Sequence, residues 1–440
     1  MGQNRDDLIQ VSGMGPGFFT KLGAACCLLL LVGYGILWSG TVQRSGGADG
    51  YVRHTEFLTT MTGAAVVAGP QPALLYDHDT QAAAQTDLLS GEADPGRLLP
   101  YTAPPFAAVL LAGPVRAGAS ASVLFTLWAV LTTTAAGLCI GLLAGRWAAP
   151  QGTPWMLMLA CTSFLPLISA LMSGQNLMPA ILGWVGVTVG LKSGRDGVAG
   201  AAGALAVLAP AILPLLLLLL LITRRWRALA ALAATLALAA LAVAPLLGVD
   251  WPLRYGHWLL ESAGLPGASG LPSILPWPAP AAGAAGVDSG TVLAAGCALL
   301  VLLWTWLPWQ GGAVWRPATV GWDLRWAISL IAMLLPALSL QPNALALAII
   351  PGWILGTHLA TGRLRSPRRV YWLAWLWIGY ALGMAATLAA GGARALVIVW
   401  LVGALAGLAW NLWSRRVDEP ERPEPPGGRP DAPWPELSGG

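Results

Sequence analysis

The chain has 440 residues, of which 56% are hydrophobic and only 10% are charged, and its mean hydropathy is +0.66. Soluble globular domains carry about 25% charged residues, so this composition excludes a soluble globule of the same length. The formal net charge is +4. Most of the basic residues flank hydrophobic runs, a distribution that orients membrane helices and does not indicate nucleic-acid binding.

Apolar runs long enough to cross the hydrocarbon layer of a membrane recur along the chain. They lack the alternation of barrel strands, so helices are the only spanning element left. With the N-terminus inside, the predicted full crossings are residues 17–40, 119–145, 153–172, 177–191, 228–247, 291–307, 326–340, 344–361, 370–390 and 396–413. The sequence therefore predicts an all-α polytopic membrane protein with both termini in the cytoplasm.

The first crossing is followed by a large outer loop at residues 41–103. Its carboxylates are Asp49, Glu56, Asp77, Asp79, Asp87, Glu92 and Asp94. Residues 105–115 are apolar but too short to span, so we expect them at the membrane surface or in a re-entrant position. The turn at residues 173–176 faces the same side. We therefore expect an outer cavity that Asp49 shares with residues 101–106 and with this turn.

Residues 197–223 are predicted to form a half-depth hairpin that enters and leaves on the cytoplasmic side. Basic residues, which prefer the cytoplasm, flank both of its ends. Pro210 and Pro214 break the helix near its middle, and Gly200 and Gly203 let the two arms pack closely. The flanking residues are Lys192 and Arg195 on one side and Arg224, Arg225 and Arg227 on the other.

The sequence predicts one membrane domain over residues 1–413 and a disordered cytoplasmic tail over residues 414–440. No nucleotide-binding fingerprint and no metal-ligand spacing occur, so we expect no cofactor and no metal. His358 is interpreted as a satisfied core histidine, and Trp251 and Trp258 as candidates for contact with a sugar or lipid. The five cysteines are interpreted as small buried hydrophobic residues: Cys26, Cys27, Cys139, Cys161 and Cys297.

Several motifs occur in a fixed order along the first half of the chain. They are Asp49-Gly50-Tyr51 directly after the first helix, Leu75-Tyr76-Asp77, residues 101–114 with Pro104-Pro105-Phe106, Gly174-Gln175-Asn176 in an outward turn, and Arg224-Arg225-Trp226-Arg227. In this order they resemble the mannosyltransferases of glycosyltransferase family 87, which belong to the GT-C superfamily of membrane glycosyltransferases. The resemblance covers residues 17–227.

The resemblance implies a GT-C-like bundle of about ten transmembrane helices in the plasma membrane. Such an enzyme moves a hexose, usually mannose, from a polyprenyl-phosphate sugar to a lipid-linked or glycan acceptor on the outer face. In that family an aspartate of the first outer loop is the general base, which maps onto Asp49. A carboxylate there can accept the proton of a sugar hydroxyl as the donor phosphate departs. The candidate substrate-binding residues are Tyr51, Arg53, Tyr76, Asp77, Tyr101, Gln175, Asn176, Arg254 and His257.

Two positions depart from the family pattern. Ala209 stands where relatives often have a lysine, and no histidine stands near the outward turn at residues 341–343. The donor phosphate would instead contact Arg44, Arg53, Arg97, Arg254 or His257. A transporter or flippase of a lipid-linked glycan, or a catalytically silent scaffold, would have similar hydrophobic helices. The large acidic outer loop favours an enzyme, and the lack of repeat symmetry between the chain halves disfavours a common carrier.

Overall fold

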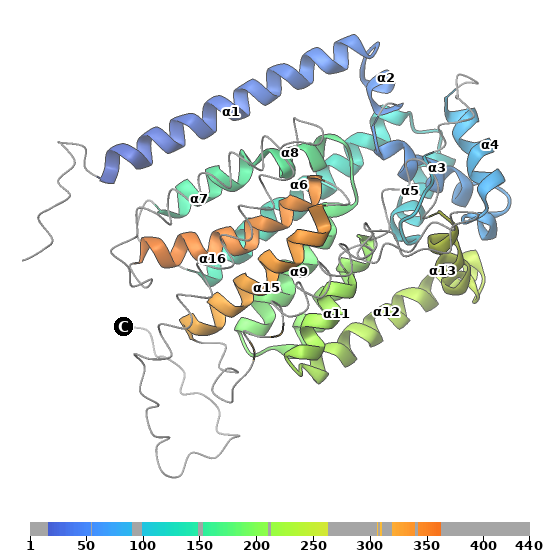
Figure 1. Cartoon of the computed structure of the whole chain (residues 1–440). Helices are drawn as coiled ribbons and strands as arrows, with labels where there is room; N and C mark the ends of the chain where they lie inside the picture. The colour runs from blue at the N-terminus through green and yellow to red at the C-terminus, as the bar shows by residue number, and fades with distance from the viewer. Residues whose placement is uncertain are drawn as a thin grey trace, which may run out of the picture.

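The computed structural model of the protein describes residues 16–53, 55–89, 99–147, 153–209, 213–262, 306, 309, 319–338 and 342–361. Within these residues every regular element is a helix, as the sequence predicts (Figure 1). Two described helices are long and apolar enough to cross a membrane, and a bent pair makes a third if it is one span. These helices are typical of a helical membrane protein.

The predicted number of ten crossings stays a prediction. The runs 370–390 and 396–413, most of 291–307 and the predicted tail lie outside the described residues. Helix α1 (Pro16–Arg44) is continuous over 29 residues, which corresponds to about 44 Å. It occupies the first predicted crossing and runs along the edge of the other helices, with most of its described contacts made to α7 and α2 (Figure 1).

Most helices surround one large hydrophobic core and are called the bundle here. They are α6 (Ala121–Arg146), α7 (Thr153–Thr162), α8 (Leu165–Met172), α9 (Leu177–Lys192), α10 (Asp196–Gly203), η4 (Ala204–Leu208), α11 (Leu213–Ile222), α12 (Trp226–Leu247), α15 (Val320–Leu338), η7 (Pro342–Ala348) and α16 (Ile349–Ala360). Helix α9 packs against α6, α8, α10 and the 3-10 helices η4 and η7. Its Trp184 is fully buried, which agrees with a central position.

A second group of helices lies at one end of the molecule in Figure 1 and is called the cap. It comprises α2 (Ala48–Arg53), α3 (Phe57–Ala68), η2 (Pro72–Leu74), α4 (His78–Leu88), α5 (Phe106–Arg116) and α13 (Trp251–Ser262). The predicted outer loop is therefore mostly helical. Residues 106–116 form helix α5, and α5 packs against the apolar helix α3. The short apolar segment is therefore a helix of the cap.

Two buried glutamines of α4 bind the extended chain that leads into α5. Gln81 accepts a hydrogen bond from the Tyr101 backbone N–H at 2.8 Å and donates one to the Leu75 carbonyl at 2.7 Å. Gln85 bonds both the N–H and the carbonyl of Leu99 at 3.0 Å. Buried amides of this kind satisfy backbone groups that lie outside helices, which explains how the cap can contain irregular chain.

The hairpin predicted at residues 197–223 has both of its ends together in the structure. The Asp196 carboxylate lies 3.4 Å from the Arg225 guanidinium. Helix α10 packs mainly against α9 and α12, so Gly200 acts differently from the prediction, whereas a Cβ on Gly203 would lie 3.2 Å from Leu216 Cδ2 of the second arm α11. A Cβ atom on Gly200 would lie 2.0 Å from the Ala228 carbonyl oxygen, so only glycine allows this contact between α10 and α12.

Two helix boundaries differ from the sequence expectation. The predicted crossing 153–172 is two helices bent by 49°, because Pro166 at the start of α8 interrupts the hydrogen-bond ladder. Helix α15 begins at Val320 and not near Trp326. Asp323 and Arg325 are therefore buried helical residues and not part of an inner loop.

Candidate active site

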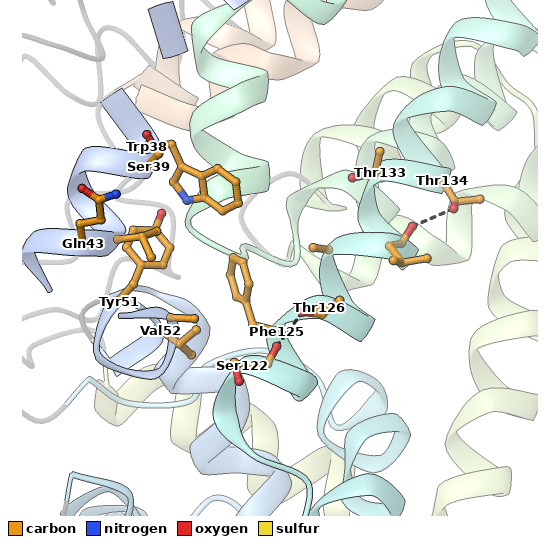
Figure 2. A pocket seen from close by; sticks show the side chains of 14 residues that line it. Trp38, Ser39, Gln43, Tyr51, Val52, Ser122, Phe125, Thr126, Thr133 and Thr134 are labelled. Atoms are coloured by element: carbon orange, nitrogen blue, oxygen red, sulfur yellow. Dashed lines mark hydrogen bonds between the residues drawn. The ribbon is translucent and has the colours of Figure 1, made fainter. Parts of the chain in front are cut away.

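A cavity of about 750 Å³ lies where α1, α2 and α6 meet. Figure 2 shows three aromatic rings among its lining residues, one from each helix. The Tyr51 ring of α2 is centred 6.4 Å from the Trp38 ring of α1 and 6.1 Å from the Phe125 ring of α6, both edge to face. Edge-to-face packing holds these rings without closing the space between the helices.

Asp49 lies in the first turn of α2, beside the end of this cavity. Its Oδ1 atom accepts a hydrogen bond from the Ser122 backbone N–H at 2.7 Å, and the neighbouring residues Ala48 and Ser122 line the cavity. The first turn of α6 has unsatisfied N–H groups that favour a negative charge, so Asp49 is held by the helix start. Within the described part of the chain, its Oδ2 atom accepts no hydrogen bond, and the side chain is exposed.

The cavity has different walls from those that the sequence predicts. Neither residues 101–106 nor the turn at residues 174–176 line it. Tyr51 connects the two places, because its ring lines the cavity while its hydroxyl donates to the Met172 carbonyl at 2.9 Å, just before the turn. Asp49 and Tyr51 are thus brought together, and the turn lies behind Tyr51.

The turn at residues 173–176 binds the start of α3 through a carboxylate that the sequence analysis did not place in the site. Gln175 Nε2 donates to Glu56 Oε2 at 2.5 Å, and the Phe57 N–H donates to the Ser173 carbonyl at 3.0 Å. Thr60 donates to the Asn176 side-chain oxygen at 3.5 Å. Glu56 lies immediately before a buried apolar helix, and this position is the sequence signal that could have identified it.

The Glu56 carboxylate is poorly hydrated although the residue keeps exposed surface. Desolvation by the surrounding protein raises the pKa of Glu56, and the hydrogen bond from Gln175 opposes part of that shift. The Oε1 atom of Gln175 is buried and has no hydrogen-bond partner among the residues that the structure describes. A carboxylate that accepts a hydrogen bond from a buried amide is suited to position the turn.

The remaining predicted substrate-binding residues of the cap make contacts within it. Tyr101 is 0% exposed, and its hydroxyl donates to the Pro104 carbonyl at 2.5 Å. Tyr76 is stacked on Tyr101 and donates to the Ala103 carbonyl at 3.2 Å. In this arrangement the core of the cap covers the Tyr101 ring, so Tyr101 has a packing role, and its contact with a substrate stays a prediction.

Asp77 and Arg254 also have partners inside the cap. Asp77 is the N-cap of α4, where it accepts bonds from the Thr80 hydroxyl at 2.6 Å and the Thr80 N–H at 2.9 Å. These bonds lower the pKa of Asp77. Arg254 donates to the carbonyls of Ala73 and Leu247, and it lies 3.1 Å from Asp250, so it ties α13 to its neighbours.

Arg53 lines a separate hollow of about 250 Å³ beside Asp87, and His257 is exposed on α13. The indoles of Trp251 and Trp258, which were candidates for sugar contact, are buried. Trp258 donates to the Tyr101 carbonyl at 2.8 Å. Both therefore act as packing residues of the cap.

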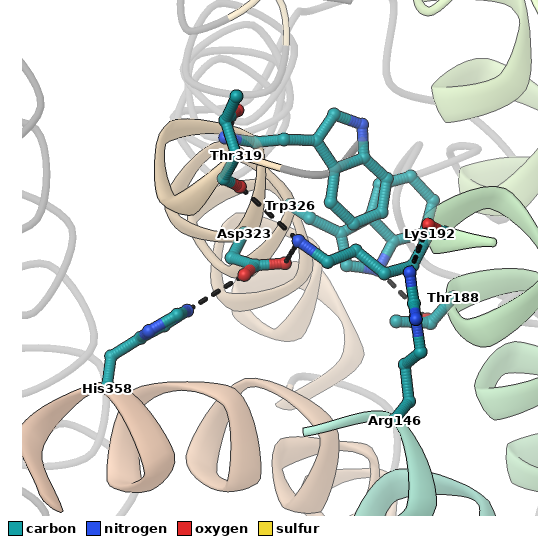
Figure 3. Close-up of polar contacts among 8 residues, drawn as sticks. Arg146, Thr188, Lys192, Thr319, Asp323, Trp326 and His358 are labelled. Atoms are coloured by element: carbon teal, nitrogen blue, oxygen red, sulfur yellow. Dashed lines mark hydrogen bonds and ion pairs between the residues drawn. The ribbon is translucent and has the colours of Figure 1, made fainter. Parts of the chain in front are cut away.

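A second polar cluster lies in the bundle, at the ends of α9 and α16 and the start of α15 (Figure 3). Asp323 lies 2.7 Å from the Lys192 ammonium and 2.8 Å from His358 Nε2. A carboxylate can only accept, so Nε2 carries the proton. The exposed fractions are 2% for Asp323, 8% for Lys192 and 1% for His358. His358 is thus buried in the core as predicted, but among the described residues only its Nε2 has a hydrogen-bond partner and the buried Nδ1 has none.

Within the described part of the chain, no group of three or more His, Cys, Asp or Glu residues could hold a metal ion. A family model described as glycosyltransferase family 87 matches residues 101–342, more than half of the chain. The matched range includes the turn at residues 173–176 and begins after Asp49 and Glu56. Comparisons with curated proteins and with solved structures give no match.

Proposed function

The chain belongs to glycosyltransferase family 87, and from this premise we propose that it transfers a hexose, mannose in the first instance, from a polyprenyl-phosphate sugar to a lipid-linked or glycan acceptor. The reaction takes place on the outer face of the plasma membrane, with the cap outside and both termini in the cytoplasm. The single observation that carries the assignment of the site is the position of Asp49. Its carboxylate has one fixed oxygen, one open oxygen and an adjacent cavity.

The chemistry assigned to Asp49 is general base catalysis. The acceptor hydroxyl oxygen forms a bond to the anomeric carbon of the donor sugar, and the bond between that carbon and the phosphate oxygen breaks. The electron pair of the broken bond leaves with the polyprenyl phosphate. The hydroxyl proton passes to the Asp49 carboxylate, and its removal makes the hydroxyl oxygen a competent nucleophile.

Other residues of the site have positioning roles. The hydrogen bond from Ser122 fixes the direction of the Asp49 carboxylate, and Tyr51 fixes α2 against the end of α8. Glu56 holds Gln175 of the turn, and Thr60 holds Asn176, close to the start of α3. Arg53, together with Arg44 at the end of α1, supplies positive charge for the donor phosphate in place of the family lysine that Ala209 replaces.

The test is sugar transfer by the purified full chain in lipid nanodiscs, with polyprenyl-phosphate [³H]mannose as donor and a membrane lipid extract as acceptor source. Asp49→Asn should reduce transfer by about a thousandfold, because the amide cannot accept the proton. The amide oxygen still accepts the Ser122 N–H bond, so the start of α6 and the thermal unfolding temperature should stay unchanged.

Asp79→Asn is the matched control, because it makes the same change at an exposed acid of the cap and should leave transfer unchanged. If Asp49→Asn retained normal turnover while Asp77→Asn lost it, the base would be Asp77. A wild-type protein that translocates a lipid-linked glycan without transferring sugar would identify a flippase and contradict the proposal.

A further inference from the structure

The cavity beside Asp49 continues as a groove along one face of α6. Its α6 lining recurs at helical spacing over Ser122, Phe125, Thr126, Ala129, Val130, Thr133 and Thr134. This stripe covers about 18 Å of helix. Because Asp49 bonds the Ser122 N–H, the carboxylate stands at one end of the stripe, and the other end lies deep along a helix that is long and apolar enough to span a membrane.

The groove is apolar along its length. The hydroxyls of Thr126 and Thr134 donate to carbonyls of their own helix at 2.7 Å, as the dashed lines in Figure 2 indicate, so they offer little to a polar ligand. Val130 is 62% exposed beside it, and Leu29 and Ile36 of α1 are similarly exposed. A volume of about 750 Å³ is in the range of ligand sites, and apolar walls with so few polar groups suit hydrocarbon.

The charges near the groove select which substrate fits. Among the described residues that line it there is no Lys, Arg or His, and its end carries the Asp49 carboxylate. A phosphodiester there would be repelled by the carboxylate without compensation, whereas a neutral hydroxyl could donate to it. Arg44 does not line the groove, and its guanidinium is close to Gly40, 3.5 Å from the position of a Cβ there.

We propose that this groove binds the hydrocarbon chain of the acceptor, and that the acceptor is a neutral, hydroxyl-bearing glycolipid whose sugar lies at Asp49. The inference rests on the proposed function, because the base must contact the acceptor and not the donor phosphate. The chain lies along α6 between α1 and Ala129, and the donor approaches from the side of Arg44 and Arg53. The acceptor therefore enters from the membrane through the space between α1 and α6.

The test uses two photoreactive probes, one with a neutral and one with an anionic headgroup, on the full chain in phosphatidylcholine nanodiscs. One is hexadecyl mannoside with a diazirine in its chain, and the other is farnesyl phosphate with the same group. We expect the mannoside to label peptides of the α6 stripe and excess unmodified mannoside to compete. Ala129→Trp should reduce labelling about tenfold, because the indole fills the groove. Leu127→Trp, an exposed position of α6 outside the groove, should not reduce it.

Three results would overturn the inference. The farnesyl phosphate could label the stripe as strongly as the mannoside, which would assign the groove to the donor. Ala129→Trp could leave labelling unchanged while its unfolding temperature matches that of Leu127→Trp. Benzoylphenylalanine at position 130 could cross-link to residues 370–413 or to a second copy of the chain, which would show that protein covers the groove. Labelling needs no transfer, so an inactive protein that binds the mannoside would refute the proposed function alone.

Discussion

The carboxylates of Asp49 and Asp323 differ in their exposure and in the charged partners that surround them. Asp323 is 2% exposed and has a lysine at 2.7 Å and a histidine at 2.8 Å. Asp49 is exposed, uses one oxygen for a helix start and has a cavity beside it. Burial of a charge requires that partners neutralise it, which leaves nothing for a substrate. In this protein the buried ionic cluster joins helices, and the open carboxylate is the one suited to chemistry.

The largest expected effect comes from removing the charge of the buried cluster. Asp323→Asn leaves the Lys192 ammonium without the carboxylate that now lies 2.7 Å from it. Breaking a buried ion pair in this way costs about 3–5 kcal/mol. We expect a marked fall in the thermal unfolding temperature of the purified protein in detergent, measured by intrinsic tryptophan fluorescence.

The double variant Lys192→Met with Asp323→Asn is the matched comparison, since it removes both charges and should recover part of the loss. Asp323→Asn with wild-type stability but no transfer would reverse the comparison between the two carboxylates. It would place chemistry in the bundle and not beside the cap.

An intermediate effect is expected at Glu56. Glu56→Gln keeps the shape but weakens the hold on Gln175, so transfer should fall about tenfold, the equivalent of one charged hydrogen bond. Desolvation raises the pKa of Glu56, so on acidification the carboxylate takes up its proton at a higher pH than an ordinary glutamate. The wild-type rate should decline through that pH, and the rate profile of Glu56→Gln should lack this limb.

At Glu56 the pH dependence of stability has the opposite sign to the pH dependence of the rate. A carboxyl whose folded-state pKa is raised stabilises the fold while protonated, and that contribution is lost as the pH rises through the folded-state value. Glu56→Gln should therefore not lower the unfolding temperature at neutral pH. A rate profile with the same acid limb in both proteins would remove Glu56 from the site.

The smallest effect is expected at Asp77, which caps α4. Asp77→Ala should cost about 1 kcal/mol of stability and leave transfer unchanged. The Thr80 bonds lower the pKa of Asp77, so its contribution is present above the unfolded-state pKa and is lost as the pH falls through the folded-state pKa. Unfolding temperatures at neutral and acidic pH should show a difference from wild type that disappears in acid. Loss of transfer would return Asp77 to the list of binding residues.

The sequence predicts the bundle better than the cap, for a physical reason. Long apolar runs predict α6, α9 and α12 almost to the residue, because a chain in an apolar environment must satisfy its backbone groups internally and therefore forms helices. In the cap, α3 was missed as a helix because its apolar run is short and lies inside an acidic loop. What buries it is α5, which is more than thirty residues away in the chain.

The residues of the candidate site also differ in how well the sequence predicts their positions. Asp49 and Tyr51 follow directly from the end of the first helix, so their place beside that helix is local information. The contact between Glu56 and Gln175 joins residues 119 positions apart, and no pattern in a single sequence encodes it. Tyr101 and Arg254 looked like surface groups because their types occur in binding sites, but only the packed cap decides that their polar atoms are used internally.

The close contacts of the hairpin have a mechanical consequence. At Gly200 the backbone of α10 touches that of α12, and a Cβ on Gly186 of α9 would lie 2.5 Å from the Ala202 Cβ. Helices usually slide in small steps as the side chains between them change rotamer. Where helices meet through backbone and Cβ atoms alone, no side-chain rotamer can change to let them slide. We therefore expect α9, α10 and α12 to move as one rigid unit. In α1, by contrast, nothing lies within 4 Å of a Cβ position on Gly33 or Gly35, so of the described helices α1 is the one that we expect to move when a substrate enters.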